Sequence, residues 1–199
     1  MTTFSLYFQL GLTHILDVRG YDHILFVVAL CAMYVLRDWR KILLLVTAFT
    51  VGHSITLALA TLRLVRLDPD LIEFLIPVTI FITAVSNIVR KRGAALPQVA
   101  PLNYALALIF GLIHGLGFSN YLRSLLGREQ SIVGPLLSFN LGLEVGQLVI
   151  VLIFLLSSSV VVGLLGASRR DWKIVISSAI AGISLMLVVE RFGVLGSGF

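Results

Sequence analysis

The sequence predicts an all-α membrane protein: a polytopic bundle of six transmembrane helices that forms a single domain over residues 1–199. Hydrophobic residues make up 58% of the chain, charged residues only 13%, and the mean hydropathy is +1.03. Soluble domains are typically about 45–50% apolar and about 25% charged. The apolar residues form long runs, and about 20 such residues cross a bilayer as a helix. Helix is expected because lipid cannot satisfy backbone hydrogen bonds.

The elements follow from these runs in chain order. Residues 4–16 are apolar but too short to cross, so we expect an interfacial or re-entrant helix packed against the bundle. This start of the chain has no basic segment followed by a small-residue cleavage site, so we expect it to be part of the mature protein. The predicted transmembrane spans lie near 21–36, 42–62, 71–89, 101–118, 132–156 and 173–190. A proline-containing linker at 94–101 divides three spans from three, without an evident sequence repeat.

Basic residues between the spans predict the orientation. The loops on one side of the predicted bundle hold Arg37, Arg40, Lys41, Arg90, Lys91, Arg92, Arg169, Arg170 and Lys173. The positive-inside rule places this side in the cytoplasm and both termini outside. The net charge of +5 lies in short clusters between apolar runs, so we expect membrane lipids and not nucleic acid as partners. A homo-oligomer is compatible with this pattern.

All four histidines lie inside or at the edge of apolar runs, at positions 14, 23, 53 and 114. A histidine in lipid is costly, because two ring nitrogens need partners, and it is therefore a functional candidate by default. On the charge-derived topology all four fall in the outer half of the membrane. We expect His23, His53 and His114 to converge on a metal ion, with His14 in a supporting role. A purely structural role for each histidine is the alternative.

Acidic and amide side chains accompany the histidines. Asp17 and Asp22 lie near His23, and Asn140, Glu144 and Gln147 share one stripe of the predicted fifth span. Imidazole with carboxylate and no sulfur suits a divalent Ni, Co or Zn ion, with Cu or Fe as further options. Glu144 is alternatively a neutral carboxyl or a proton relay. We expect Asp17, Thr50, Asn140 and Gln147 to support the site.

Small residues predict which helices approach closely. Gly111 and Gly115 have GxxxG spacing in the fourth predicted span, as do Gly142 and Gly146 in the fifth. Such faces allow close helix packing. We therefore expect these two spans to meet and to bring His114 near Glu144.

Four stretches, at residues 20–26, 49–56, 110–118 and 139–147, together resemble the HupE/UreJ family of small bacterial membrane proteins. That family is associated with hydrogenase and urease gene sets and is regarded as nickel or cobalt permeases. The resemblance implies metal contacts from His23, His53, His114, Asp22 and Glu144, and a place in the bacterial inner membrane. His14 lacks the neighbouring proline of the better-studied members, so the chain looks like the second, less characterised branch.

Two functions remain open from the residues, and the resemblance favours the first. One is a divalent-metal permease. The other is an intramembrane zinc-dependent hydrolase that cuts a lipid or peptide bond near the outer leaflet. In that enzyme the three histidines would bind zinc, Asp22 or Glu144 would act as general base, and Ser54 would orient the substrate. A scaffold with a structural metal is a third, weaker reading.

Overall fold

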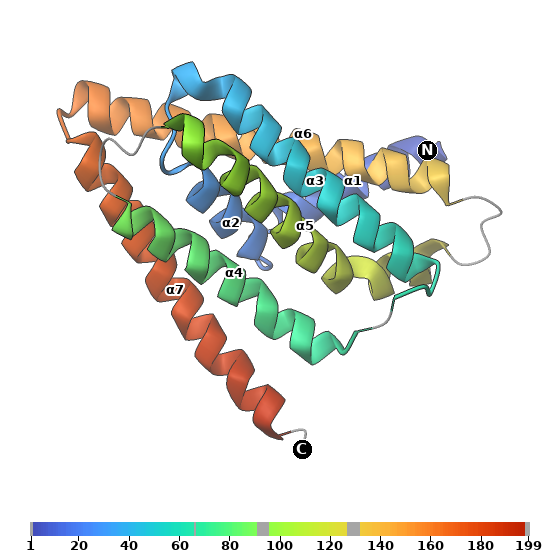
Figure 1. The fold of residues 1–199 in the computed structure, drawn as a ribbon. Helices are drawn as coiled ribbons and strands as arrows, with labels where there is room; N and C mark the ends of the chain where they lie inside the picture. The colour runs from blue at the N-terminus through green and yellow to red at the C-terminus, as the bar shows by residue number, and fades with distance from the viewer. Residues whose placement is uncertain (1, 66, 91–95, 127–131, 198–199) are drawn as a thin grey trace.

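The computed structural model describes residues 2–65, 67–90, 96–126 and 132–197, and over these ranges every regular element is helical (Figure 1). The α-helices are α1 (Thr3–Leu16), α2 (Asp22–Cys31), α3 (Trp39–Thr61), α4 (Pro69–Val89), α5 (Leu96–Leu126), α6 (Val133–Ser159) and α7 (Arg169–Ser197). A 3-10 turn at Leu36–Asp38 precedes α3, and a π-helical turn at Val160–Leu164 extends α6. The all-α class is confirmed.

Local sequence explains several helix ends. Thr2 caps α1 by accepting a hydrogen bond from the Ser5 amide at 3.3 Å. Pro69 opens α4 behind Asp68, whose side chain accepts from the Asp70 amide at 3.0 Å. After the π-helical turn, Gly166 adopts a φ of +73°, which glycine tolerates without strain and which redirects the chain toward α7.

The predicted set of six long spans is only partly present. Four helical segments are long and apolar enough to cross a membrane: Leu36–Thr61, Pro69–Val89, Val133–Leu164 and Arg169–Val194. The predicted span at 101–118 lies within α5, whose apolar described part, Asn103–Ser119, falls short of that criterion. The predicted span at 21–36 is wrong as a single helix, because α2 has only 10 residues and ends at Cys31. The following residues turn into the 3-10 segment before α3.

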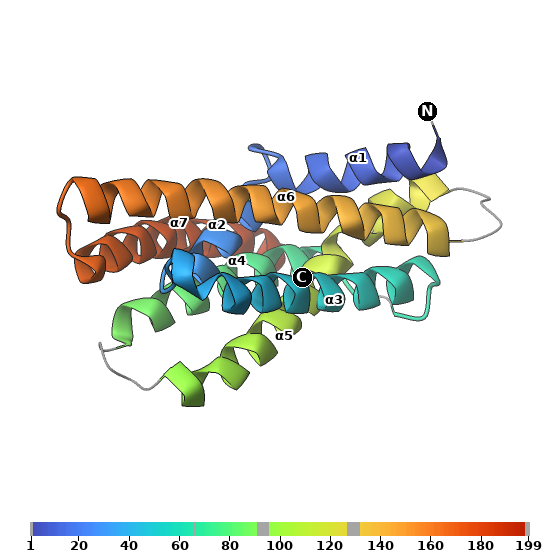
Figure 2. The same cartoon turned by 90° about the horizontal axis from the view of Figure 1, so that it is seen from above.

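Helices α1 and α2 follow one another along the long axis of the molecule, and both views agree on this (Figures 1 and 2). The α1 helix packs along α6 and buries Tyr7, Gly11 and Ile15. The α2 helix continues on the other side of the break at 17–21 and contacts α4 and α6. The N-terminal segment is therefore packed against the bundle, as predicted, and makes the first half of a two-part helix.

Two parallel helix pairs, α3 with α5 and α1 with α6, share one packing geometry. Gly52 of α3 faces the Leu108 carbonyl of α5, and Gly111 of α5 faces the Phe49 carbonyl. Gly11 of α1 faces the Phe139 carbonyl of α6, and Gly142 of α6 faces the Phe8 carbonyl in the same reciprocal way. A Cβ at any of the four glycines would collide with backbone, so glycine permits this approach.

These two pairs run in opposite directions, which indicates an internal inverted repeat (Figures 1 and 2). The third extensive contact joins α4 to α7, which are antiparallel: Glu73 bonds Arg191 at one end, and the Lys173 ammonium donates to the Arg90 carbonyl at the other. In such a repeat α1, α3 and α4 correspond to α5, α6 and α7, and α2 is an addition to the first half.

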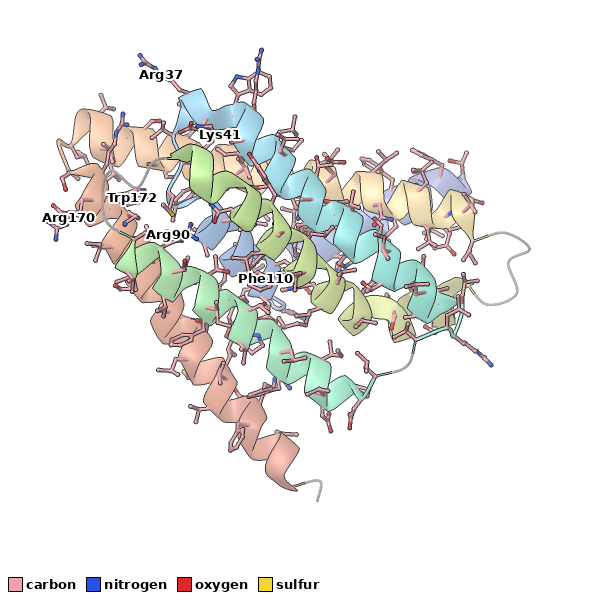
Figure 3. The ribbon with its side chains drawn as sticks, viewed as in Figure 1. Arg37, Lys41, Arg90, Phe110, Arg170 and Trp172 are labelled. Carbon is pink, nitrogen blue, oxygen red and sulfur yellow. The ribbon has the colours of Figure 1, made fainter. Side chains whose placement is uncertain are left out.

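The labelled basic residues gather at one end of the bundle, where α4 ends and α3 and α7 begin (Figure 3). We call this the basic end; the loop between α3 and α4 marks the far end. The labelled basic residues there are Arg37, Lys41, Arg90 and Arg170. The core between the two ends is apolar and aromatic, with Phe26, Phe49 and Phe139 fully buried.

Candidate metal centre

Three histidines from three helices converge where α1 and α2 meet. His14 lies in the last turn of α1, His23 in the first turn of α2, and His53 within α3. One ring nitrogen from each lies within 4.8 Å of the others. Ring centroids are 4.7 Å apart for His14 and His23, and 6.4 Å apart for His23 and His53. Zn–N bonds of about 2.0–2.1 Å span such separations after small side-chain adjustments.

The ring nitrogens of this cluster are buried and lack protein partners. His14 Nε2, His23 Nε2 and both nitrogens of His53 make no hydrogen bond in the described structure, and His53 is fully buried. A buried polar atom without a partner costs about 1–3 kcal/mol. Several convergent lone pairs of this kind fit a bound transition-metal ion, which would satisfy them together.

His114 lies beside the three and is already oriented. Its Nδ1–H donates to the Phe110 carbonyl at 2.9 Å, because a carbonyl can only accept. The lone pair is therefore on Nε2, which is buried without a partner. Its ring lies 5.2 Å from that of His23. A backbone carbonyl that fixes a histidine tautomer is the usual outer-shell partner of a metal ligand.

The helix break explains how His14 and His23 come together. The α1 helix stops at Leu16, and α2 restarts at Asp22, so the two histidines face each other across the interruption. His14 lies among the carbonyl groups that end α1, which carry partial negative charge and favour a cation. Gly52 precedes His53 and lets α3 pack tightly on α5, which fixes the third side of the cluster.

Aromatic rings surround the histidines on both sides. Phe118 lies 4.0 Å from His14, between ring centroids, and stacks on Phe139 at 5.1 Å. On the other side, Phe26 and Phe49 each lie 5.3 Å from His114. Phe26, Phe49 and Phe139 are fully buried, whereas Phe118 is half-buried, so the apolar cover is more complete on the side of Phe26 and Phe49.

The two predicted carboxylates lie outside the group of three. Glu144 accepts a hydrogen bond from the Thr47 hydroxyl at 2.8 Å. Asp22 is adjacent to His23 in sequence but has electrostatic interactions with Arg191 and Glu73, which bond each other at 2.6 Å. Among the described residues, one group of three potential metal ligands has all its ligand atoms within 4.8 Å of one another. It consists of His14, His23 and His53.

The predicted supporting residues divide between α3–α6 contacts and the helix break. The Thr50 hydroxyl donates to Gln147 Oε1 at 2.8 Å, and the Ser54 hydroxyl donates to the Thr50 carbonyl at 2.6 Å. Asn140 Oδ1 is buried and has no partner among the described residues. Asp17 accepts from the Arg19 amide at 2.9 Å and stabilises the turn between α1 and α2.

The predicted meeting of the two GxxxG helices is wrong. Gly111 and Gly115 of α5 pack on α3, whereas Gly142 and Gly146 of α6 pack on α1. Any helix with a small face can accept several partners, so the motif predicted close packing correctly and its partner incorrectly. His114 accordingly neighbours His23, and Glu144 bonds to α3.

A family model described as HupE / UreJ protein matches residues 1–192. The chain belongs to the HupE/UreJ family. No curated protein and no solved structure matches it. The HupE/UreJ family is associated with nickel/cobalt transport. The apolar helices and this membership together describe a multi-pass membrane protein.

In this HupE/UreJ protein, the sequence predicted only a supporting role for His14, whereas the structure places it in the group of three histidines. A signal was available: Gly11-Leu-Thr-His14 and Gly111-Leu-Ile-His114 share a pattern, each on a helix packed by its glycine. The sequence contains no signal for the aromatic rings of the site, because their spacing alone does not distinguish a ring over a histidine from a ring in lipid.

Proposed function

We propose that this HupE/UreJ protein is a permease for a divalent transition-metal ion of the nickel/cobalt type. The observation that carries the proposal is the convergence of buried, unpartnered imidazole nitrogens from His14, His23 and His53. Such an arrangement is unfavourable in an empty protein and favourable with a cation bound. Family membership supports transport as the use of that cation.

The cargo would be coordinated chiefly by neutral nitrogen. Imidazole ligands suit Ni, Co and Zn ions, whereas Mg and Ca prefer oxygen. Glu144 is hydrogen-bonded to Thr47, and the described ligand group contains three histidines and no carboxylate. Neutral ligands hold a dication less strongly than anionic ones, and a transported ion must leave as well as bind.

The broken helix places the site between two half-helices. We propose that α1 and α2 form one crossing together, so that the chain crosses six times in all. Their 14 and 10 residues extend about 36 Å at about 1.5 Å per residue, enough for a hydrocarbon core of about 30 Å. Transporters built from inverted repeats commonly bind their cargo near the midplane, at interrupted helices.

The basic end would face the cytoplasm of a bacterial inner membrane. Arg37, Lys41, Arg90 and Arg170 gather there, and cytoplasmic loops are enriched in such residues. With six crossings, both termini would lie outside. The metal would enter from the far end and leave at the basic end.

The hydrolase alternative is less well supported. A zinc hydrolase needs a general base within hydrogen-bond reach of the metal-bound water. Glu144 is bonded to Thr47, Asp22 interacts with Arg191 and Glu73, and Ser54 donates to a backbone carbonyl. Neither Glu144 nor Asp22 belongs to the group of three histidines.

The proposal is tested by binding and flux measured on the same preparation. Purified protein should bind about one Ni²⁺ or Co²⁺ per chain, and proteoliposomes should take up the ion faster than empty vesicles. His53→Ala should abolish both binding and uptake. Asn103→Ala is the control: it removes a polar side chain that is hydrogen-bonded to Arg90 and Tyr34, and it should retain metal binding. Metal binding without flux, together with lipid or peptide hydrolysis lost in His53→Ala, would instead support the hydrolase.

A further inference from the structure

Two cavities approach the histidine cluster from opposite ends without reaching it. The basic-end cavity, of about 60 Å³, is lined by residues that include Tyr34, Asn87, Arg90, Asn103 and Phe110. The far-end cavity, of about 390 Å³, includes Glu73, Leu116, Gly117 and Ser119. None of the four histidines lines either cavity.

Three buried aromatic rings lie between the histidines and the basic-end cavity. Phe110 lines that cavity, and its ring lies 5.5 Å from Phe26. Phe26 lies 5.0 Å from Phe49, and both contact His114 at 5.3 Å. Figure 3 places Phe110 at mid-length of the bundle, away from the labelled basic residues. Phe26 and Phe49 are fully buried, so the barrier is dry.

A second aromatic pair, in which Phe139 is fully buried and Phe118 half-buried, lies on the far-end side of the cluster. Phe118 stacks on Phe139 with 15° between the rings, and both contact His14. In the sequence, Phe118 stands between Gly117 and Ser119, and both of these neighbours line the far-end cavity. The cluster is thus covered on both sides by aromatic rings.

The inverted repeat relates one ring of each layer, Phe49 and Phe139. Phe49 precedes Gly52 by three residues on α3, and Phe139 precedes Gly142 by three residues on α6, where each glycine makes the equivalent backbone contact. The two rings also lie at matching distances from His53, 6.1 Å and 6.2 Å. A conformation in which the two halves exchange roles would therefore exchange the rings that face the two ends of the bundle.

We infer that Phe26, Phe49 and Phe110 form a closed gate between the metal cluster and the basic-end cavity, and that this cavity is where the divalent cation is released. This inference rests on the proposed transport function. A dry aromatic constriction blocks a hydrated ion, because the ion would have to shed water with nothing to replace it.

The chemistry of the basic-end cavity suits release and not retention. Its described polar lining offers neutral groups from Tyr34, Thr83, Ser86, Asn87 and Asn103 and the Met33 thioether, and no carboxylate or imidazole is among the described lining residues. The Arg90 guanidinium donates to Asn103 at 2.8 Å and places a positive charge in the cavity wall. A dication that passes the gate would meet weak ligands and electrostatic repulsion, which favour its departure toward the basic end.

The gate is tested by water access to the cluster, a readout that needs no metal. A thiol is placed behind the gate by His114→Cys, in a Cys31→Ala background of the full chain. An impermeant cationic thiol reagent is then applied to membrane vesicles of either orientation. We expect slow labelling from both faces, and Phe110→Ala should speed labelling from the face that bears Arg37 and Arg170 by at least about tenfold.

Phe154→Ala is the matched control, because it also removes a buried phenyl ring, which stacks on Trp172 instead of on a histidine. Equal acceleration by Phe154→Ala, or no acceleration by Phe110→Ala, would overturn the gate. If Phe110→Ala does not fold, Phe110→Leu replaces it, because leucine retains most of the apolar volume. Phe110→Leu should then speed labelling by a smaller factor, and no acceleration would overturn the gate.

A second arm uses Co²⁺ with all four histidines intact. Phe110→Ala should keep the bound stoichiometry and release Co²⁺ to EDTA at least about tenfold faster than wild type. An unchanged release rate would contradict the gate. If wild-type protein binds no Co²⁺, the proposed function fails, and the labelling experiment still decides whether the aromatic layer closes the cluster.

Discussion

His53 is fully buried, yet neither of its ring nitrogens has a partner in the part of the protein that the structure describes. At the scale of single residues, this is the clearest conflict between stability and function in the molecule. A folded protein retains such a group when it gains something else from it, and under the proposed function that gain is a ligand position. The same reasoning applies to the buried Nε2 atoms of His14, His23 and His114.

The first prediction concerns that conflict. His53→Leu should raise the free energy of unfolding of metal-free protein by about 1–2 kcal/mol, because a buried polar group without partners is replaced by an apolar one of similar volume. The same variant should lose metal binding. Thermal unfolding in EDTA, alongside equilibrium dialysis against Ni²⁺, checks both. A destabilised metal-free variant would mean that the His53 nitrogens are satisfied by water.

The second prediction concerns the bond between Thr50 and Gln147, which joins α3 to α6 at 2.8 Å in a buried position. Thr50→Val keeps the shape but leaves Gln147 Oε1 without its donor, at a cost of about 1–3 kcal/mol. Adding Gln147→Leu should recover part of this loss. A double-mutant cycle measured by thermal unfolding gives the coupling energy. Ser157→Ala, at an exposed position of α6, should change little.

At the scale of elements, sequence predicted the helices well and their neighbours poorly. The runs at 42–62 and 71–89 correspond closely to α3 and α4, because hydropathy reports directly on local burial in lipid. The first span failed because apolar character continues across 21–36 while the helix stops at Cys31. The GxxxG faces of α5 and α6 likewise packed on α3 and α1, a choice that depends on helix rotation.

The third prediction concerns these glycine contacts. Gly111→Ala should destabilise the protein by about 1–3 kcal/mol or more, because its Cβ would collide with the Phe49 carbonyl, which belongs to a rigid helix backbone. Gly182→Ala is the control: no atom lies within 4 Å of its Cβ position in α7, so improved helix propensity should add up to about 1 kcal/mol. Thermal unfolding of both variants compares the two effects. Equal stability would show that α3 and α5 have room to separate.

At the scale of the whole molecule, the inverted repeat organises the architecture. It places the two glycine-packed pairs head to tail and joins α4 to α7, one helix from each half. The repeat was invisible in sequence because only a few positions are shared: Gly11 and His14 of α1 match Gly111 and His114 of α5. Backbone packing constrains those glycines, while lipid-facing positions accept any apolar residue.

The fourth prediction concerns orientation. If the basic end is cytoplasmic and the chain crosses six times, the C-terminus lies outside. A C-terminal alkaline phosphatase fusion should therefore be active, since that enzyme needs disulfides that form outside the cytoplasm. A green fluorescent protein fusion at the same point should be dark. Fusions truncated after Arg90 should behave in the opposite way. A bright C-terminal fluorescent fusion would contradict the orientation.

The sequence by itself determined the helical class, the membrane character, the basic end and the presence of histidines in apolar surroundings. These follow from composition and local pattern, because burial in lipid selects residues one position at a time. Only the tertiary structure decided that His14 joins His23 and His53, that Glu144 bonds Thr47, and that aromatic layers cover the cluster. Those outcomes depend on where α1 breaks and on which glycine face meets which helix. Interhelical rotation and register set them, and they leave no periodic signal along the chain.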